Sequence, residues 1–326
     1  MPRTTLADVA REAGVSVALV SIVMRDVPGA SDATRLRVRE IADRLGYVPD
    51  QRARKLRQSS SRLIGVTFNL RQPFHGDIVE HLYVAAEHHG YDLAISAVAP
   101  TRGEEAALED LLRERCEVAI LLGPGLTDEQ LAHQASRVPS ILVARRSEVD
   151  GVGSVRSDDV AGVELAVDHL VELGHRSLVH VDGGTAPGAA DRRAGFEAAV
   201  ARHGLEGRVV PGGPTEADGA EAMRSLLDSP ATGILAFNDH CAAGVLHVLA
   251  RARVDVPGDL SVIGYDDSRL AVGEQPMTTV SQDAAALARE AVENALAMID
   301  ASPARDVVLP PSLVVRSTSG PAPGHP

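Results

Sequence analysis

The sequence has little cysteine and no long apolar run. Its two cysteines, Cys116 and Cys241, lie far apart and form no CxxC pair. This argues against a disulfide framework or a structural zinc site and fits a reducing compartment. No uninterrupted stretch approaches the roughly 20 apolar residues of a membrane span, and the first residues, MPRTTLADVA, lack the apolar core of a secretion signal. We therefore expect a soluble protein of the cytoplasm with no membrane partner.

The common catalytic and cofactor motifs are also missing. Neither a GxSxG elbow nor a GKS or GKT phosphate loop occurs in the chain. The segment GPGLTD, starting at Gly123, begins like a dinucleotide-binding loop but lacks the third glycine. His88 and His89, like His175 and His180, have no clustered metal ligands beside them, so we expect exposed or core histidines. These absences predict a protein that is not an enzyme and that carries no metal or other cofactor.

The charge of the chain is unevenly distributed. Residues 1–62 contain twelve basic and seven acidic side chains, a balance of +5 within a total of -13, which leaves -18 for the rest. A basic head on an acidic body indicates that the head alone meets a polyanion. Charge alone would fit a solvated helical surface equally well, so the pattern of residues has to decide.

That pattern predicts three short helices at the N-terminus. The first has apolar residues at helical spacing and ends at Gly14. Ser16 is a good N-cap for a second helix over about Val17–Met24, and Ser31 caps a third that ends near Leu45. Helices this short must pack on one another, through Leu6, Val9, Val20, Val23, Val38, Ile41 and Leu45. Two helices joined by a tight turn and backed by a third form a helix-turn-helix unit, whose second helix lies in the DNA major groove.

Several motifs of this region resemble one family closely. The stretch TLADVAREAGVS, the VS pair in the second helix and GYVPD followed by RARKL resemble the head of the lactose/galactose repressor family of bacterial transcription regulators. The resemblance implies a DNA-binding head over residues 1–49 and a hinge and linker over 50–61, with a short helix that folds on DNA. Asp50 stands where an asparagine is common, although an aspartate can also cap a helix.

The resemblance also assigns residues of the head to DNA. It places Val17, Ala18 and Ile22 where the family meets base edges. All three are apolar and cannot make the hydrogen bonds that usually specify a base, so we expect them to contact thymine methyl groups. The residues expected to hold phosphates are Thr5, Ser16, Ser21 and Arg35.

The hinge is predicted to fold on binding DNA. Arg52 and Lys55 belong to a basic segment that would repel itself in a free helix, and DNA phosphates would relieve that repulsion. Ala53 and Leu56 match the family's minor-groove residues. A small alanine lets two hinges approach, and a leucine from each can wedge between base steps and kink the duplex. The alternative is that Leu56 covers the core of the body.

From Leu63 onward, apolar strands alternate with amphipathic helices. This alternation predicts βαβ units and parallel sheets with both faces covered, and about 250 residues of it exceed one sheet. We therefore expect two α/β lobes. Candidate strands begin at Leu63, Asp92, Val118, Ser140, Ser177, Gly233 and Leu260, and a helix over 283–301 and the strands VVLP and SLVVR close the chain.

The resemblance extends over this body, residues 62–326, which looks like the two-lobed, doubly wound core of periplasmic-binding-protein type found in the same family. It implies a ligand cleft between the lobes and three crossovers near residues 157, 283 and 310. The implied N-lobe spans about 62–157 and 283–308, and the implied C-lobe about 158–282 and 309–318.

Matching to the family places an effector site in the cleft. The matched residues are Arg192, Asn238, Asp266 and Gln282, with Phe74 from the N-lobe loop. An arginine and amides that donate, with a carboxylate that accepts, suit a polyhydroxylated ligand. Phe74 could stack on its ring. Ligands at the carboxyl ends of parallel strands are also what the general rule for open α/β sheets predicts.

Neighbouring residues have other expected roles. Asp159 and Asp239 precede predicted helices and are expected as N-caps, while Tyr265 is expected in the core. At the family's other pocket positions this chain has Leu122 and Ala144, so the identity of the ligand does not carry over. The DGGTAPG segment is expected as a turn facing the cleft.

The function that follows is a sequence-specific transcription regulator, most simply a repressor, whose operator affinity changes when a sugar or related metabolite binds between the lobes. We expect a homodimer, because two heads on a two-fold axis read a pseudo-palindromic operator and the resembling family pairs its bodies side by side. The tail SLVVRSTSGPAPGHP has no heptad pattern, so we expect no tetramer of the kind that some relatives form. The alternative is a solute-binding protein that uses the same body for transport or chemosensing. Whether the effector releases or promotes DNA binding stays open.

Overall fold

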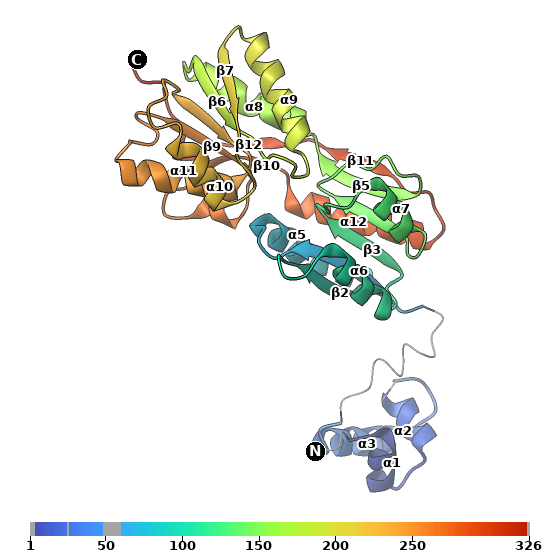
Figure 1. Ribbon diagram of the computed structural model, residues 1–326. Coiled ribbons are helices and arrows are strands. Elements are labelled where there is room, and N and C mark those ends of the chain that lie inside the picture. The colour runs from blue at the N-terminus through green and yellow to red at the C-terminus, as the bar shows by residue number, and fades with distance from the viewer. Residues whose placement is uncertain (1–3, 25, 48–59, 325–326) are drawn as a thin grey trace. The chain divides into compact units, whose positions relative to one another are not determined.

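The computed structural model describes residues 4–24, 26–47 and 60–324. The chain divides into two compact units, residues 1–61 and 62–326 (Figure 1). The predicted hinge contacts lie outside the described residues: Arg52, Ala53, Lys55 and Leu56.

The first unit contains the three predicted helices, α1 (Leu6–Ala13), α2 (Val17–Met24) and α3 (Asp32–Arg44). Gly14 ends α1 in the left-handed conformation at a φ of 65°, which glycine adopts without steric cost. Most of the predicted core is confirmed: the buried cluster contains Val9, Val20, Val23, Val38 and Ile41, while the partly buried Leu6 and Leu45 pack against it. The helix-turn-helix prediction is therefore confirmed as a fold.

Side chains cap these helices as the sequence predicts. The Ser16 hydroxyl accepts a hydrogen bond from the Leu19 N–H at 3.1 Å, and the Ser31 hydroxyl accepts one from the Thr34 N–H at 3.3 Å. Each cap satisfies a backbone donor that has no partner within its own helix.

The second unit holds two six-stranded sheets. The N-lobe sheet has the order β11-β5-β4-β3-β1-β2 and is parallel throughout. Its strands are β1 (Leu63–Asn69), β2 (Asp92–Val98), β3 (Val118–Leu122), β4 (Ser140–Val143), β5 (Val152–Ser157) and β11 (Asp306–Leu309).

The C-lobe sheet has the order β12-β10-β9-β8-β6-β7, and only the β10–β12 pair is antiparallel. Its strands are β6 (Ser177–Val181), β7 (Glu206–Val210), β8 (Gly233–Ala236), β9 (Ser261–Asp266), β10 (Thr278–Ser281) and β12 (Ser312–Val314).

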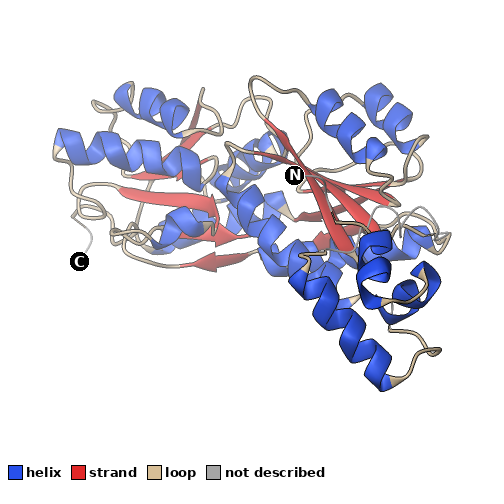
Figure 2. Ribbon diagram, turned by 90° about the horizontal axis from the view of Figure 1, so that it is seen from below, coloured by secondary structure: helices blue, strands red, loops and turns tan. Residues whose placement is uncertain are grey.

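Helices cover both faces of each sheet, so the two-lobed, doubly wound fold is confirmed (Figure 2). The N-lobe helices are α5 (Pro73–His88), α6 (Glu104–Arg113), α7 (Asp128–Ala135) and α12 (Ala284–Ile299). The C-lobe helices are α8 (Asp159–Glu172), α9 (Ala189–Arg202), α10 (Glu216–Arg224), α11 (Asp239–Ala252) and the short 3₁₀ helix η1 (Arg269–Val272).

Alternate strand residues pack on opposite helix layers. In β3, Ile120 belongs to the core beneath α5 and α12, whereas Leu121 belongs to the core beneath α6 and α7. Successive side chains of a strand point to opposite faces, so a sheet covered on both faces needs apolar residues at every position. This explains why the continuous apolar run VAILL forms a strand that is buried on both faces.

The chain passes between the lobes three times, after β5, after β10 and after β11. Three strands, β5, β7 and β10, have no counterpart among the candidate strands of the sequence. Strand β5 contains Ser154, whose buried hydroxyl donates to the Asp306 carboxylate at 2.6 Å. Backbone pairing with β4 and β11 holds the strand in the sheet, and the bond to Asp306 gives the buried Ser154 hydroxyl a partner.

The histidines occupy the two environments expected of them. His88 and His89 are exposed, whereas His175 and His180 are buried. The His180 ring stacks on Phe196 and donates from Nδ1 to the Leu235 carbonyl at 3.1 Å. Burial lowers the pKa of His180 from 6.5 to about 4.

Because the folded pKa of His180 lies below its unfolded value, its stabilising effect is present above pH 6.5 and is lost as the pH falls toward 4. At pH 5 this loss amounts to about 2 kcal/mol. We predict that His180→Asn, which keeps a donor near the Nδ1 position but does not titrate, lowers stability at pH 7. Its further loss between pH 7 and pH 5 should be smaller than that of the wild type by about the same 2 kcal/mol.

Urea unfolding of both proteins at the two pH values measures this difference. The buried carboxyl of Asp239, whose pKa burial raises to about 6, acts in the opposite direction but is present in both proteins. Equal losses in the wild type and the variant would contradict the prediction.

Candidate functional site

A cavity of about 280 Å³ lies between the two lobes, and all five predicted effector residues line it. Most of its walls follow the carboxyl ends of strands. Asn69 ends β1, Asp266 ends β9, and Ala144 and Asn238 come just after β4 and β8. The location therefore agrees with the rule for open α/β sheets. The predicted residues that line it are Phe74, Arg192, Asn238, Asp266 and Gln282.

Arg192 is the most enclosed charge of the site. Its side chain is 4% exposed and reaches the cavity from the first turn of α9. Nε donates to Asp159 at 2.8 Å, one terminal nitrogen donates to the Phe237 carbonyl at 2.7 Å, and the guanidinium lies 3.6 Å from the centre of the Tyr265 ring. Burial disfavours the charged form, but the combined attraction of Asp159, Tyr265 and Asp266 outweighs it and raises the pKa of Arg192 above its ordinary value.

The expected N-cap roles of Asp159 and Asp239 are wrong. In each case the residue one position earlier caps the helix, because the cap precedes the first helical residue. Asp158 accepts a hydrogen bond from the Ala161 N–H at 3.0 Å, and Asn238 caps α11. Asp159 is thereby free to pair with Arg192.

Asp239 is fully buried beside the site. Its carboxylate accepts hydrogen bonds from the Ser268 backbone N–H at 2.7 Å and from the Thr279 hydroxyl at 2.6 Å. These bonds tie the start of α11 to η1 and β10. The expected core position of Tyr265 is confirmed, because its side chain is 1% exposed.

Asp266 and Gln282 form a connected pair. Gln282 donates from Nε2 to the Asp266 carboxylate at 2.6 Å, and its carbonyl oxygen accepts from the Ser157 hydroxyl at 3.0 Å. These two bonds fix the orientation of the Gln282 amide. Burial raises the pKa of Asp266 well above its usual range, although Arg192 acts in the other direction.

The backbone at Asp266 is strained. Asp266 has a φ of 113° and Asp267 a φ of 54°, values that L-residues rarely adopt. Such a conformation costs about 1–3 kcal/mol and persists only where the surroundings enforce it. Here the turn after β9 directs the Asp266 carboxylate into the cavity while the Asp267 carboxylate binds Arg316 at 2.6 Å.

Asn238 connects the two lobes across the cavity. Its side-chain oxygen accepts from the Cys241 N–H at 2.8 Å and caps α11. Its amide nitrogen lies 3.4 Å from both the Gln72 side-chain oxygen and the Pro214 carbonyl. The Asn238 amide nitrogen thus makes only long hydrogen bonds, and a ligand oxygen at a shorter distance can replace them.

On the N-lobe side, Phe74 is 5% exposed and packs in the lobe core while it lines the cavity. Ala144 lines it too, but Leu122 is buried in the core beneath α5 and α12. Arg145 is used elsewhere, because it donates to the Pro124 and Leu126 carbonyls at 2.6 and 2.7 Å. The DGGTAPG turn faces the cavity as expected, through Ala186 and Pro187.

His75 is a cavity residue that the sequence did not assign. It follows Phe74 on α5, is 9% exposed and lines the cavity. Its Nδ1 accepts a hydrogen bond from the Asn69 backbone N–H at 3.0 Å. The only sequence signal was its place in the matched loop beside Phe74.

An ion pair between Asp77 and Arg269 joins the lobes outside the set of residues that line the cavity. Asp77 of α5 accepts a hydrogen bond from the Arg269 backbone N–H at 3.1 Å and a second from its Nε at 2.6 Å. Two bonds to one carboxylate fix the position of η1 against α5. Because Asp77 belongs to the N-lobe and Arg269 to the C-lobe, both bonds would break if the lobes moved apart.

In the head, the predicted base-reading residues lie on α2. Val17 is 47% exposed and Ala18 is exposed, whereas Ile22 is half-buried beside Gly29. Ile22 does not belong to the buried head core, which contains Val20 and its neighbours. The side of α2 that carries Val17 is thus available to a partner.

The predicted phosphate contacts have structural roles within the head. Thr5 is the N-cap of α1 and donates to Asp8 at 2.6 Å. Arg35 spans the turn between α2 and α3, where it donates to Asp26 at 3.1 Å and to the Val27 and Ala30 carbonyls. Ser21 is half-buried on α2. Their roles on DNA stay predictions.

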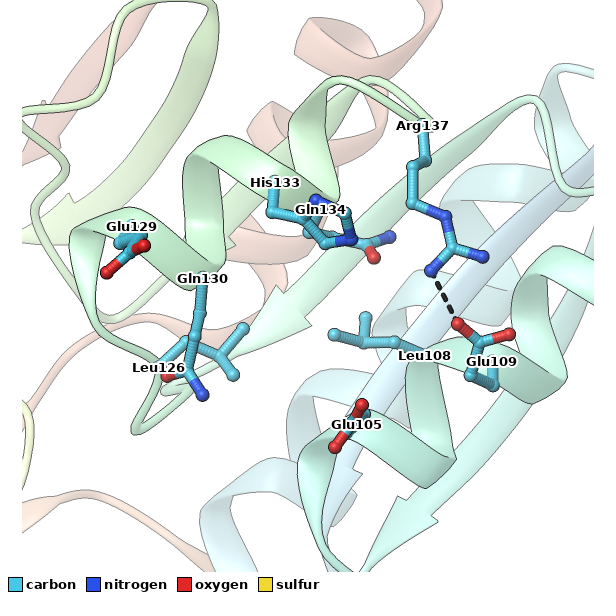
Figure 3. Close-up of a pocket in the computed structure, with 9 residues that line it drawn as sticks. All are labelled: Glu105, Leu108, Glu109, Leu126, Glu129, Gln130, His133, Gln134 and Arg137. Carbon is cyan, nitrogen blue, oxygen red and sulfur yellow. Dashed lines mark hydrogen bonds and ion pairs between the residues drawn. The ribbon is translucent and has the colours of Figure 1, made fainter.

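A second cavity, of about 410 Å³, lies between α6 and α7 within the N-lobe (Figure 3). Leu108 and Leu126 line it, and the Arg137–Glu109 ion pair crosses one side. It contains none of the predicted effector residues, so the interlobe cavity is the better candidate. Among the residues that the structure describes, no three His, Cys, Asp or Glu side chains gather as metal ligands, and no helix is long and apolar enough to cross a membrane.

The buried pair of Arg192 and Asp159 can be tested by stability. We predict that Arg192→Ala lowers the free energy of unfolding by about 3–5 kcal/mol, because it leaves the Asp159 carboxylate buried without its partner. Adding Asp159→Ala should restore part of this loss. Arg193→Ala, which breaks a more exposed pair with Asp182, should cost about 1 kcal/mol or less. Urea unfolding measures all three, and a double variant no more stable than Arg192→Ala would disprove the account.

Two family models match parts of the chain. The model of bacterial regulatory proteins of the lacI family matches residues 5–50, and that of a periplasmic binding protein-like domain matches residues 167–319. The HTH-type transcriptional regulator GalR of Escherichia coli is 34% identical over 325 residues, which cover 96% of this chain and 94% of the relative.

Solved structures resemble the chain as well. A LacI transcriptional regulator from a Rhodococcus species is 57% identical, with a TM-score of 0.78 over 79% of this chain and 98% of its own. The lac repressor dimer bound to operator and the anti-inducer ONPF is 27% identical, with a TM-score of 0.81 over 98% and 100%. The CelR–cellobiose complex is 28% identical, with a TM-score of 0.71 over 97% and 100%.

The head, the two-lobed body and the near-complete match to a curated regulator lead to one conclusion. The chain belongs to the lactose/galactose repressor family of bacterial transcription regulators.

Proposed function

We propose that this protein represses transcription in the cytoplasm by binding a pseudo-palindromic operator as a homodimer, and that a sugar in the interlobe cavity changes its affinity for DNA. The observation that carries the proposal is the cavity, because the five matched residues, which are far apart in the sequence, all line it. The same chain has a helix-turn-helix head that can bind DNA. The protein acts by binding and switching, without catalysis.

The chemistry of the cavity supports a sugar. Asn238 and Gln282 offer amides, Asp266 a carboxylate and Arg192 a guanidinium. Such groups match hydroxyls that both donate and accept. Phe74 and Phe237 add apolar surface for the C–H face of a ring. The complex of CelR with cellobiose supports the same ligand class.

Exposed apolar side chains support pairing of two bodies. Tyr83 and Val84 of α5, Ile95 of the edge strand β2 and Val272 of η1 are 47–65% exposed. Both lobes contribute to this set, which suits side-by-side pairing with a second copy of the chain. The lac repressor dimer on its operator supports this assembly.

On DNA, α2 of each head enters the major groove, where Val17, Ala18 and Ile22 contact thymine methyl groups. The hinge contributions remain proposals that lie outside the described residues. Arg52 and Lys55 bind phosphates, and Ala53 and Leu56 enter the minor groove.

An effector can shift DNA affinity only if it prefers one lobe arrangement. Three contacts define the present arrangement: the Asp77–Arg269 pair, the Asn238–Gln72 contact and the Ser157–Gln282 bond. A ligand that replaces or strengthens any of them changes the balance between arrangements. The N-lobes of the dimer then move, and with them the spacing of the two hinges.

DNA recognition provides the direct test. We predict that the full-length protein shifts a palindromic DNA from its own upstream region in a gel, and that Ile22→Ala changes the sequence preferred in a binding selection. Leu36→Ala, an exposed position on α3, is the matched control and should leave the preference unchanged. An unchanged preference in Ile22→Ala would show that Ile22 does not read bases. Failure of the wild type to bind any such palindrome would refute the function.

The interlobe pair provides a test of the switch. We predict that Asp77→Ala speeds amide hydrogen exchange in residues 72–80 and 268–277, because it removes both bonds to Arg269 and lets the lobes separate more often. Glu80→Ala, exposed on the same helix, is the control and should leave both segments unchanged. Equal exchange in Asp77→Ala and the wild type would show that this pair does not hold the lobes together.

A further inference from the structure

His75 is the cavity residue whose chemistry is most tightly defined by its surroundings. Its Nδ1 accepts the Asn69 backbone N–H at 3.0 Å, so this nitrogen carries no proton. A neutral imidazole has one proton, which must therefore sit on Nε2. Among the described residues, Nε2 has no hydrogen-bond partner, and it lies beside Gly123, another residue that lines the cavity. The ring thus presents a single donor to the cavity.

The surroundings also keep this ring uncharged. His75 is 9% exposed, and burial lowers its pKa from 6.5 to about 4. At neutral pH the imidazole is neutral and held in one tautomer. It offers a ligand a hydrogen bond but no positive charge.

The rest of the cavity offers no spare positive charge either. Arg192 is the only lysine or arginine among the residues that line it. Its guanidinium is already paired with Asp159 at 2.8 Å and lies 3.9 Å from Asp266. Glu104 adds a carboxylate, which accepts the Gly125 backbone N–H at 2.6 Å. A phosphate or carboxylate entering the cavity would lose its hydration without gaining an unpaired cation.

The size of the cavity limits the ligand as well. Its volume of about 280 Å³ falls just below the range of roughly 300–1,000 Å³ that is usual for small-molecule sites. One sugar ring suits this space better than a chain of rings.

Resting on the function proposed above, we propose that the effector is an uncharged monosaccharide-sized polyol, that His75 donates from Nε2 to one of its oxygens, and that the phosphate ester of the same sugar is rejected. His75 is then a specificity-determining residue of the N-lobe wall. A ligand without an oxygen at that point leaves a buried donor unpaired, which penalises it more than the lost contact alone.

Two isosteric variants separate the two nitrogens of the ring. In His75→Asn, the amide oxygen can take the place of Nδ1 and keep the bond from the Asn69 N–H, but the donor at Nε2 is gone. In His75→Gln, the longer amide can place its nitrogen near Nε2 and keep the donor. We expect the Kd of the free sugar to rise about tenfold or more in His75→Asn and to stay within about threefold in His75→Gln.

The probes are D-glucose, D-galactose and D-ribose, each beside a phosphate ester: glucose 6-phosphate, galactose 1-phosphate and ribose 5-phosphate. Thermal shift of the full-length protein selects the free sugar that raises its Tm, and calorimetry gives the Kd for the wild type and both variants. At least one free sugar should bind, and its ester should bind at least tenfold more weakly.

Three results would overturn the inference. They are an ester that binds as tightly as its free sugar, a wild type that none of the free sugars stabilises, and a His75→Asn variant with unchanged affinity. If His75→Asn does not fold, the comparison of sugar with ester and the affinity of His75→Gln decide. Operator binding by the wild type is measured separately, so its loss would refute the proposed function, whereas its presence beside any of these results would refute only the inference.

Discussion

The buried guanidinium of Arg192 is the constraint on which the C-lobe wall of the cavity depends. A charge taken out of water costs several kcal/mol unless it is paired and hydrogen-bonded. Arg192 meets this demand with the Asp159 carboxylate at the start of α8, the Phe237 carbonyl after β8 and the Tyr265 ring in β9. Because all three contacts must form together, they preorganise this wall of the cavity. Ligand binding then does not have to supply the entropy cost of ordering these side chains.

The two walls of the cavity differ in character, and this difference suits a switch. The C-lobe contributes the buried ionic network around Arg192 and Asp266, whereas the N-lobe contributes the neutral side chains of His75 and Gln72 and a single carboxylate, Glu104. Among the described residues, the hydrogen bonds between the lobes include the Asp77–Arg269 pair, the long Asn238–Gln72 contact and the Ser157–Gln282 bond beside two of the three crossovers. Two packed lobes joined through contacts of this kind can change their arrangement, as an effector-responsive body requires.

Part of this protein could be predicted from its sequence because the responsible forces are local. Spacing of apolar residues and capping side chains defined all three head helices, since a cap such as Ser16 acts on a backbone group three residues away. Continuous apolar runs defined the strands that are covered on both faces. The resemblance to a family then indicated the five cavity residues, which lie at strand ends or in the helices that follow them, on the edge where a parallel sheet gathers its carboxyl ends.

Only the tertiary structure determines the features that depend on partners far away in the sequence. The sequence does not predict strand β5, because the buried polar Ser154 interrupts the apolar run and finds its partner in Asp306, 152 residues later. The role of Asp159 depends on Arg192, 33 residues away, and a shift of one position from the helix cap is enough to free it for that pairing. His75 is a donor to the cavity because the Asn69 N–H occupies its other nitrogen and burial lowers the pKa of the ring, which keeps it uncharged. Burial, pairing and tautomer are properties of the assembled environment, and no local pattern of residues encodes them.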